Sequence, residues 1–323
     1  MKTHFYKTTA AVLAVSMLLS LTACQSAPQE VESQGDSSAL VEIEQEAVPK
    51  DKIPQVSYVK VPTNPGITVY SNSSASIDAS NASEGYVSVK YTGSSSSRIK
   101  VQITKNTTYT YDLNNKGNYE VFPLSEGDGS YSVKVFENVS GNKYAQAYST
   151  TFSVTLKNNF TPFLYPNQYV DFNADSKAVK KAAELASPTG DQLETIANVY
   201  NFVINNVTYD DAKAATVSSG YLPKVDSVLS SGKGICFDYA ALMTAMLRSQ
   251  GIPTKLVVGY TGDLYHAWIN TYIPNVGWVN NMIYFDGTSW KLMDPTFASN
   301  GKSSPEIMKY IGDGRNYRSK YTY

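Results

Sequence analysis

The sequence contains few of the side chains that most often carry covalent or metal chemistry. Among its 323 residues there are two cysteines and two histidines. Two cysteines exclude a scaffold held by several disulfides and a cysteine-rich zinc finger, and two histidines leave little room for a multi-histidine metal centre. Any catalytic site must therefore use few residues, and we predict no metal-ligating residues and no cofactor.

Net charge is also nearly absent. The 27 Lys and Arg residues are balanced by 28 Asp and Glu residues, and no run of basic residues stands out. The chain therefore offers no electrostatic reason to bind nucleic acid, and we expect no such partner. A hydrophobic share of 42% and an aromatic share of 12% argue against wholesale disorder, and the length fits about two folded domains.

The first residues follow the order of an export signal. Lys2 and Lys7 precede an uncharged apolar run, Thr8–Leu21, which is too short for a stable transmembrane helix. The run closes with Leu21-Thr22-Ala23-Cys24, which resembles the lipobox of bacterial lipoproteins. The resemblance implies a signal peptide over residues 1–23, acylation of Cys24 by a chain such as palmitate, and anchoring of the exported protein to the bacterial cell membrane. An ordinary signal peptide is the alternative.

Removal of that signal would leave one thiol and one imidazole. His4 would be lost and Cys24 acylated, so only Cys236 and His266 would remain for chemistry. Residues 24–55 are rich in Ser, Gln and Glu, and we interpret them as an acidic tether that holds the folded part off the membrane. An acidic interaction tail is the less favoured interpretation.

Residues 56–160 contain short alternating or β-branched and aromatic segments that are typical of strands. Clusters of Gly, Asn and Ser separate them at the spacing expected of an all-β sandwich, so we predict an immunoglobulin-like domain here. Its many tyrosines could form a binding face, but tyrosine favours strands in any case, and we prefer that explanation. The predicted strands are Tyr86–Tyr91, Arg98–Ile103, Thr108–Leu113, Tyr119–Phe122, Tyr131–Phe136 and Ala145–Leu156.

After Pro166 the apolar spacing becomes helical, and we place a second domain over residues 166–323. Helices are predicted over Ser176–Ala186 and Asp191–Val207, with a break at Ser187-Pro188-Thr189-Gly190. A later helix begins near Cys236 and must end before Pro253. Apolar residues cover most of its circumference, which predicts a buried helix at the centre of the domain.

Cys236 lies at the start of that buried helix. The unpaired N–H groups of a helix N-terminus favour a thiolate and can also receive an oxyanion. Asp238 suits the first turn of a helix, yet its charge repels a thiolate. We therefore expect that Cys236 needs a basic partner.

His266 is the remaining candidate for that partner. It lies in a predicted strand, Tyr265–Tyr272, where period two places it on one face with Trp268, a residue that could shield a Cys–His pair and touch substrate. A catalytic imidazole needs its far nitrogen held by a carboxylate or amide. Asp294, at the end of a later strand, is suited to that role. The strands leading to it are predicted at Gly277–Val279, Ile283–Phe285 and Trp290–Met293, with a turn at Asp286-Gly287.

Each of these signals is common alone, but their order along the chain is specific. Over about Ser176–Asn300 the sequence resembles the transglutaminase-like core superfamily. The resemblance implies an α+β, papain-like fold in which Cys236 is the nucleophile, His266 the general base and then acid, and Asp294 the orienting carboxylate. Many members carry arginine after the Gly-Ile-Pro segment, where this chain has Lys255. The motifs are Gly234-Ile235-Cys236-Phe237-Asp238-Tyr239-Ala240, Met246-Leu247-Arg248, Gly251-Ile252-Pro253, Val258-Gly259-Tyr260, His266-Ala267-Trp268 and Asp294-Pro295-Thr296.

The expected chemistry is attack of the Cys236 thiolate on an amide, with a thioester intermediate. The backbone N–H of Cys236 and a second donor, for which Tyr209 is the candidate, would hold the oxyanion. The resemblance implies a protease, as is expected of prokaryotic members of the superfamily, so we favour hydrolysis of protein or cell-wall peptide. Two alternatives stay open: a cross-linking transglutaminase, and a non-catalytic surface-binding protein.

Overall fold

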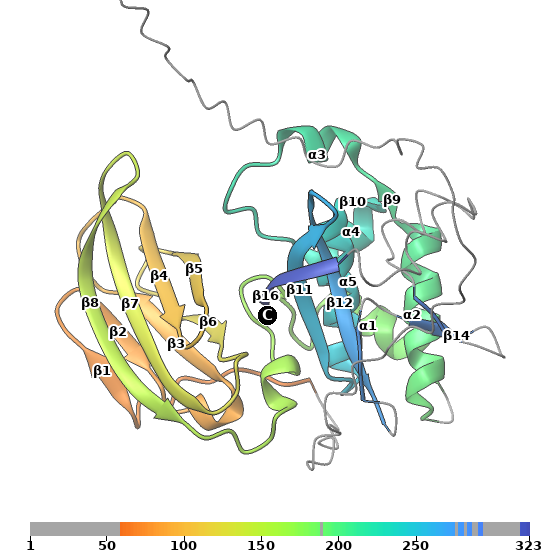
Figure 1. Ribbon diagram of the computed structural model, residues 1–323, viewed down its shortest axis with the longest axis horizontal. Helices are drawn as coiled ribbons and strands as arrows, with labels where there is room; N and C mark the ends of the chain where they lie inside the picture. The colour runs from red at the N-terminus through yellow and green to blue at the C-terminus, as the bar shows by residue number, and fades with distance from the viewer. Residues whose placement is uncertain (1–58, 188–189, 275–276, 281–282, 286–289, 293–316) are drawn as a thin grey trace, which may run out of the picture.

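The structure is a computed structural model, and it describes residues 59–187, 190–274, 277–280, 283–285, 290–292 and 317–323. The chain is a mixed α/β protein in two regions. An N-terminal region made of sheets precedes a region in which helices pack on a further sheet (Figure 1). None of the helices in the described residues is long and apolar enough to cross a membrane.

The N-terminal region is built from two four-stranded antiparallel sheets. One has the order β1-β2-β3-β6 and the other the order β5-β4-β7-β8. A short 3₁₀ helix, Ala82–Glu84, precedes β3. The strands are β1 (Val69–Ser71), β2 (Ala75–Asp78), β3 (Tyr86–Tyr91), β4 (Ile99–Thr104), β5 (Thr108–Leu113), β6 (Glu120–Pro123), β7 (Gly129–Ser140) and β8 (Lys143–Val154).

Alternation along the strands builds the core of this region. In β4, Ile99, Val101 and Ile103 are buried, while the residues between them are half-exposed. Tyr111 of β5 lies against Phe122 of β6, with ring centroids 4.8 Å apart, so the two sheets share buried contacts. The region is therefore rich in sheet as expected, while its immunoglobulin-like topology stays a prediction.

The second region has a central helix, α5, packed against a four-stranded sheet of order β13-β12-β11-β16. A 3₁₀ helix, Thr161–Phe163, stands at the junction of the regions. Two small two-stranded sheets, β9 with β10 and β14 with β15, complete the described strands. The elements are α1 (Lys177–Leu185), α2 (Gln192–Asn206), β9 (Thr208–Tyr209), α3 (Asp211–Thr216), α4 (Val225–Ser231), β10 (Lys233–Gly234), α5 (Cys236–Ser249), β11 (Thr254–Thr261), β12 (Leu264–Ile273), β13 (Gly277–Val279), β14 (Ile283–Phe285), β15 (Trp290–Leu292) and β16 (Tyr317–Thr322).

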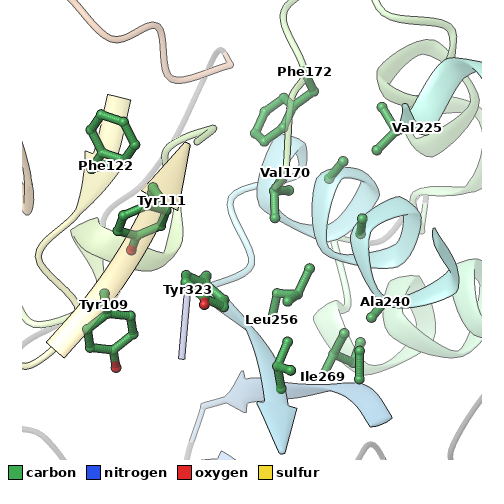
Figure 2. Packing of buried hydrophobic residues seen from close by; sticks show 14 of the residues in the cluster. Tyr109, Tyr111, Phe122, Val170, Phe172, Val225, Ala240, Leu256, Ile269 and Tyr323 are labelled. Carbon is green, nitrogen blue, oxygen red and sulfur yellow. The ribbon is translucent and has the colours of Figure 1, made fainter. Parts of the chain in front are cut away.

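Helix α5 is bounded by side-chain and backbone caps. At its start the Asp238 carboxylate accepts the Ile235 backbone N–H at 2.9 Å. At its end Gly251 adopts φ +76°, and the Ile252 N–H returns to the Leu247 carbonyl at 3.1 Å. The residues between these caps are almost all buried, and Figure 2 shows Ala240 close to Leu256 of β11 and Ile269 of β12. The predicted buried central helix is confirmed.

A tyrosine cluster joins the two regions. Figure 2 shows Tyr323, which follows β16, beside Tyr109 and Tyr111 of β5. The ring of Tyr323 lies 5.6 Å from Tyr109, 5.9 Å from Tyr111 and 4.6 Å from Tyr169. Tyr321 lies 5.3 Å from Tyr109. These five residues, which we call the tyrosine cluster, make one continuous contact between the sheets and the helical region, in which Tyr109, Tyr111 and Tyr323 are buried and Tyr169 and Tyr321 partly buried.

Several predicted elements match the structure closely. β3 and β5 have the predicted bounds, and α1 and α2 differ from the predicted helices by about one residue at each end. β14 pairs with β15 as predicted for the hairpin, with Ile283 opposite Leu292. The sequence did not predict β1, β2, β9, β10, β11, β16, α3 or α4.

Candidate functional site

Cys236 is the first residue of α5, and its side chain is partly exposed. The preceding residues, β10, pair in parallel with β9, so that Gly234 lies opposite Tyr209. This pairing fixes the chain just ahead of the helix. The cysteine therefore lies at the accessible N-terminal end of a helix whose body is buried, as the sequence predicted.

Tyr209, the candidate oxyanion donor, is half-buried and lies on β9. Its partner residue Gly234 is two positions before Cys236, so the structure brings Tyr209 to the neighbourhood of the nucleophile. Its assignment as a donor stays a prediction.

His266 lies near the start of β12 and is 2% exposed. Its ring is 6.4 Å from that of Trp268, with 24° between the planes, as expected for alternate residues on one face of a strand. Trp268 is 1% exposed, so it shields the histidine's surroundings from water and offers little surface to a substrate. On the neighbouring strand Gly259 lies opposite His266, and a Cβ there would come within 2.9 Å of the Trp268 ring.

Helix α5 and strand β12 run in the same direction, so their starts lie at one end of the layer. Ionisation of Cys236 is one of the causes that raise the pKa of Tyr265, behind burial and the charges of Tyr321 and Tyr260, and this places the thiol near the start of β12. At the far end Arg248 of α5 donates to the carbonyl of Thr254, which pairs with Thr271 of β12. Cys236 and His266 therefore belong to the same end of the molecule.

The two faces of β12 carry different neighbours. Ile269 lies on the side that packs towards α5 (Figure 2), whereas His266 and Trp268 alternate with it. Tyr265, the residue before His266, shares the face of Ile269 and is 53% exposed. Tyr265 and His266 therefore belong to opposite faces of β12.

Asp238 is placed differently from what the sequence suggested. The sequence indicated an acidic side chain whose charge opposes a thiolate at Cys236. In the structure Asp238 is completely buried, and its carboxylate accepts hydrogen bonds from the Ile235 N–H, from Lys213 Nζ at 2.6 Å and from the Tyr221 hydroxyl at 2.5 Å. The negative charge is thus offset by an ion pair and two hydrogen bonds. Asp238 therefore opposes a thiolate at Cys236 less than the sequence suggested.

No pattern in the sequence indicates Lys213 and Tyr221 as partners of Asp238. Their distances from Asp238 along the chain, 25 and 17 residues, follow no motif. The available signal was an acidic residue inside an otherwise apolar helix, because a buried carboxylate needs partners. The sequence could not say which residues those partners are.

Lys255 is accounted for by packing. Its Nζ lies 4.0 Å from the ring centroid of Trp278 and 5.1 Å from that of Phe163. Cation–π contacts of this kind stabilise a charged side chain over an aromatic face. The lysine therefore belongs to a small aromatic cluster at the far end of β11 from His266.

Two predicted site residues lie outside the described residues. These are Asp294, the predicted orienting carboxylate, and Cys24, the predicted lipid anchor. Within the described residues there is no group of three or more His, Cys, Asp or Glu side chains that could hold a metal ion.

A family comparison matches the part of the chain that holds these residues. Residues 179–295 match the model of the transglutaminase-like superfamily. This segment is a transglutaminase-like domain. It includes α5, β12 and Asp294, so all three residues of the predicted triad fall within it. The predicted resemblance is confirmed.

The curated relatives have no assigned activity. The chain is 23% identical over 189 residues to the uncharacterized protein YebA of Bacillus subtilis, a match that covers 52% of this chain and 26% of the relative. It is 26% identical over 177 residues to the uncharacterized protein Rv2569c of Mycobacterium tuberculosis, covering 50% of this chain and 49% of the relative. The chain thus spans about a quarter to a half of the length of the relatives it matches.

Two solved structures show a distant likeness. One is described as a candidate cysteine protease from Cytophaga hutchinsonii, with 15% identity, a TM-score of 0.36 and coverage of 74% of this chain and 83% of that one. The other is described as a candidate protease from Parabacteroides distasonis, with 15% identity, a TM-score of 0.29 and coverage of 57% and 38%.

Proposed function

We propose that the protein is a cysteine hydrolase that cleaves amide bonds of protein or cell-wall peptide through a thioester on Cys236. The observation that carries this proposal is the position of Cys236. It is the accessible first residue of the buried central helix of a transglutaminase-like domain, at the same end as His266. The helix N-terminus favours a thiolate at that place.

The proposed reaction has two halves. The Cys236 sulfur attacks the amide carbonyl carbon, the C–N bond breaks, and the imidazolium of His266 gives its proton to the departing nitrogen. Water then attacks the thioester, His266 takes a proton from it, and the acid leaves as the thiol is restored. Asp294 would hold the far nitrogen of the imidazole throughout.

The oxyanion of each tetrahedral intermediate needs donors near the sulfur. The proposed first donor is the Cys236 backbone N–H, which lies in the first turn of α5, where the helix dipole favours a negative charge. Tyr209 is the proposed second donor, which the pairing of β9 with β10 supports because it brings Tyr209 close to the start of α5.

Hydrolysis and cross-linking share every step up to the thioester. Attack by an amine instead of water would make the protein a transglutaminase, which remains the alternative enzyme. The second alternative is a surface-binding protein whose sheet region does the work. The partly exposed cysteine at a helix start argues against it, because a purely structural cysteine is ordinarily buried.

A product assay separates these possibilities. The exported part of the chain is incubated with protein and with cell-wall peptide in the presence of a labelled primary amine, alongside Cys236→Ala. We expect new carboxyl termini or free acid with the wild type and none with the variant. Incorporated amine would indicate a transglutaminase, and no product from either substrate together with an unreactive thiol would favour the surface-binding alternative.

We also propose that the protein is exported and held to the bacterial cell membrane through acylated Cys24. The sequence of charged, apolar and small residues at positions 1–24 supports this. The sheet region and the tether would then hold the domain away from the lipid. If Cys24→Ser leaves the protein in the membrane fraction, the anchor is not this residue.

A further inference from the structure

The carboxylate of Asp238 is held over the chain that leads into Cys236. Its Oδ2 accepts the Ile235 N–H at 2.9 Å, and a Cβ on Gly234 would lie 2.6 Å from the Asp238 Cβ. The side chain thus covers the two residues that precede the cysteine and leaves space only for glycine there. Asp238 thereby fixes the backbone from which the thiol projects.

Lys213 reaches this carboxylate because the residues before α3 are hydrogen-bonded to the residues before α5. The Asp210 backbone N–H donates to the Gly234 carbonyl at 3.0 Å, which continues the pairing of β9 with β10. The Asp210 side chain then caps α3 by accepting the Lys213 N–H at 3.0 Å. This cap sets the first turn of α3 so that Lys213 Nζ meets Asp238 Oδ2 at 2.6 Å.

Tyr221 closes the other side of the network. Its hydroxyl lies 2.5 Å from Asp238 Oδ1 and 2.5 Å from Lys213 Nζ. Burial, followed by the hydrogen bond to Asp238, raises the pKa of Tyr221 above its usual range, so it serves as a donor at all ordinary pH values. Both oxygens of the buried carboxylate therefore have partners.

We propose that Lys213 and Tyr221 are positioning residues for Cys236. They neutralise Asp238, so that this carboxylate can fix the start of α5 without repelling a thiolate two residues away. The charged and titratable groups around this turn are Lys213 on α3, Tyr221 before α4, Asp210 through its effect on Tyr221, Cys236 itself, and Tyr265 on β12. The inference rests on the proposed function.

The test measures the pH dependence of Cys236 alkylation by iodoacetamide in the full exported chain. We expect Lys213→Met to raise the midpoint by about one pH unit, which is the usual scale of a lost neighbouring opposite charge, and so to slow alkylation near neutral pH about tenfold. Lys213→Arg, which keeps the charge, should recover most of that shift. Lys213→Met/Asp238→Asn, which removes both charges, should return the midpoint to near the wild-type value.

Lys224→Met is the matched control, because Lys224 is 62% exposed and lies 3.4 Å from Asp171. The inference would be overturned if Lys213→Met left the midpoint of alkylation unchanged. It would also be overturned if the midpoint of Lys213→Met/Asp238→Asn were shifted as far as that of Lys213→Met. If Lys213→Met does not fold, Tyr221→Phe carries the test, with a smaller upward shift expected and no shift overturning it. A wild-type thiol no more reactive than free cysteine removes the proposed function as well, whereas a reactive wild type with unshifted variants removes only this inference.

Discussion

Arg248 shows how a single motif residue can hold the transglutaminase-like domain together. It is 1% exposed and donates to three backbone carbonyls: Thr254 at 2.8 Å, Tyr165 at 2.6 Å and Tyr323 at 2.7 Å. Burial lowers its pKa to about 9. These carbonyls belong to the start of β11, the segment before α1 and the end of β16. Only the planar, forked donor set of arginine reaches all three.

Replacing Arg248 should therefore be costly. We expect Arg248→Met to lower the free energy of unfolding by about 4 kcal/mol, because three buried carbonyls lose a charged donor. Urea denaturation measures this, with the exposed Arg318→Met as the matched control. A loss below about 1 kcal/mol would mean that water or another group satisfies these carbonyls.

Among single residues, the sequence indicated those that lie in recognisable motifs and did not indicate those that lie outside them. Cys236 and His266 stood out because a mature chain would hold no other thiol or imidazole. The partners of Asp238 could not be predicted, since Lys213 meets it only through the capping of α3 and the pairing of β9 with β10. The functional consequence of Asp238 changed with them, from a charge opposing the thiolate to a neutralised cap.

Among the elements, the sheet behind α5 is assembled from segments far apart in sequence. β11 pairs with β12 through a hairpin and with β16 across more than fifty residues, with a shift in register between Val258 and Gly259. A Cβ on Gly259 would lie 2.1 Å from the Arg318 carbonyl oxygen of β16. The glycine of the Val258-Gly259-Tyr260 motif is thus required for the close approach of β16.

We expect Gly259→Ala to destabilise the domain by about 2 kcal/mol or more, since a backbone atom must move to make room. Its cross-strand neighbour Ser319 is exposed, so Ser319→Ala should change stability by less than about 0.5 kcal/mol. Thermal unfolding of both variants checks the difference. Equal melting temperatures would show that β16 is free to shift.

Periodic elements were predictable from sequence, and short paired ones were not. An apolar pattern of their own marks α1, α2, α5, β3, β4, β5 and β12, which is why their bounds were predicted to within a few residues, whereas β11 was not predicted. β9 and β10 are two residues long and form because their backbone groups pair with each other across the chain, and α3 is only six residues long. No local pattern can encode a partner that lies more than twenty residues away.

In the molecule as a whole, the tyrosine cluster is expected to make the folded state less stable at alkaline pH. Burial, and after it the charge of Asp112, raises the pKa of Tyr169 to about 12, and burial raises those of Tyr111 and Tyr323 well above their usual range. In the unfolded chain these groups ionise near pH 10. Between pH 10 and pH 12 the unfolded state therefore binds fewer protons than the folded one, and folding stability falls as the pH rises.

We expect the free energy of unfolding to be nearly constant from neutral pH to about pH 10 and then to drop steeply towards pH 12. Tyr169→Phe should make the drop shallower, because one group with a raised pKa is lost. Tyr144→Phe, a change on β8 outside the cluster, is the control. Denaturant titrations at several pH values measure the slope, and an unchanged slope in Tyr169→Phe would show that folding does not raise the pKa of Tyr169.

The most direct test of the account is the reactivity of Cys236 with and without His266. We predict that iodoacetamide alkylates wild-type Cys236 near neutral pH at least tenfold faster than a free thiol, and that His266→Ala removes most of this excess. Trp268→Phe, which keeps a buried aromatic ring on the same strand face, should retain most of the wild-type rate. A wild-type rate equal to that of a free thiol, unchanged by His266→Ala, would contradict the assignment of Cys236 as a catalytic nucleophile.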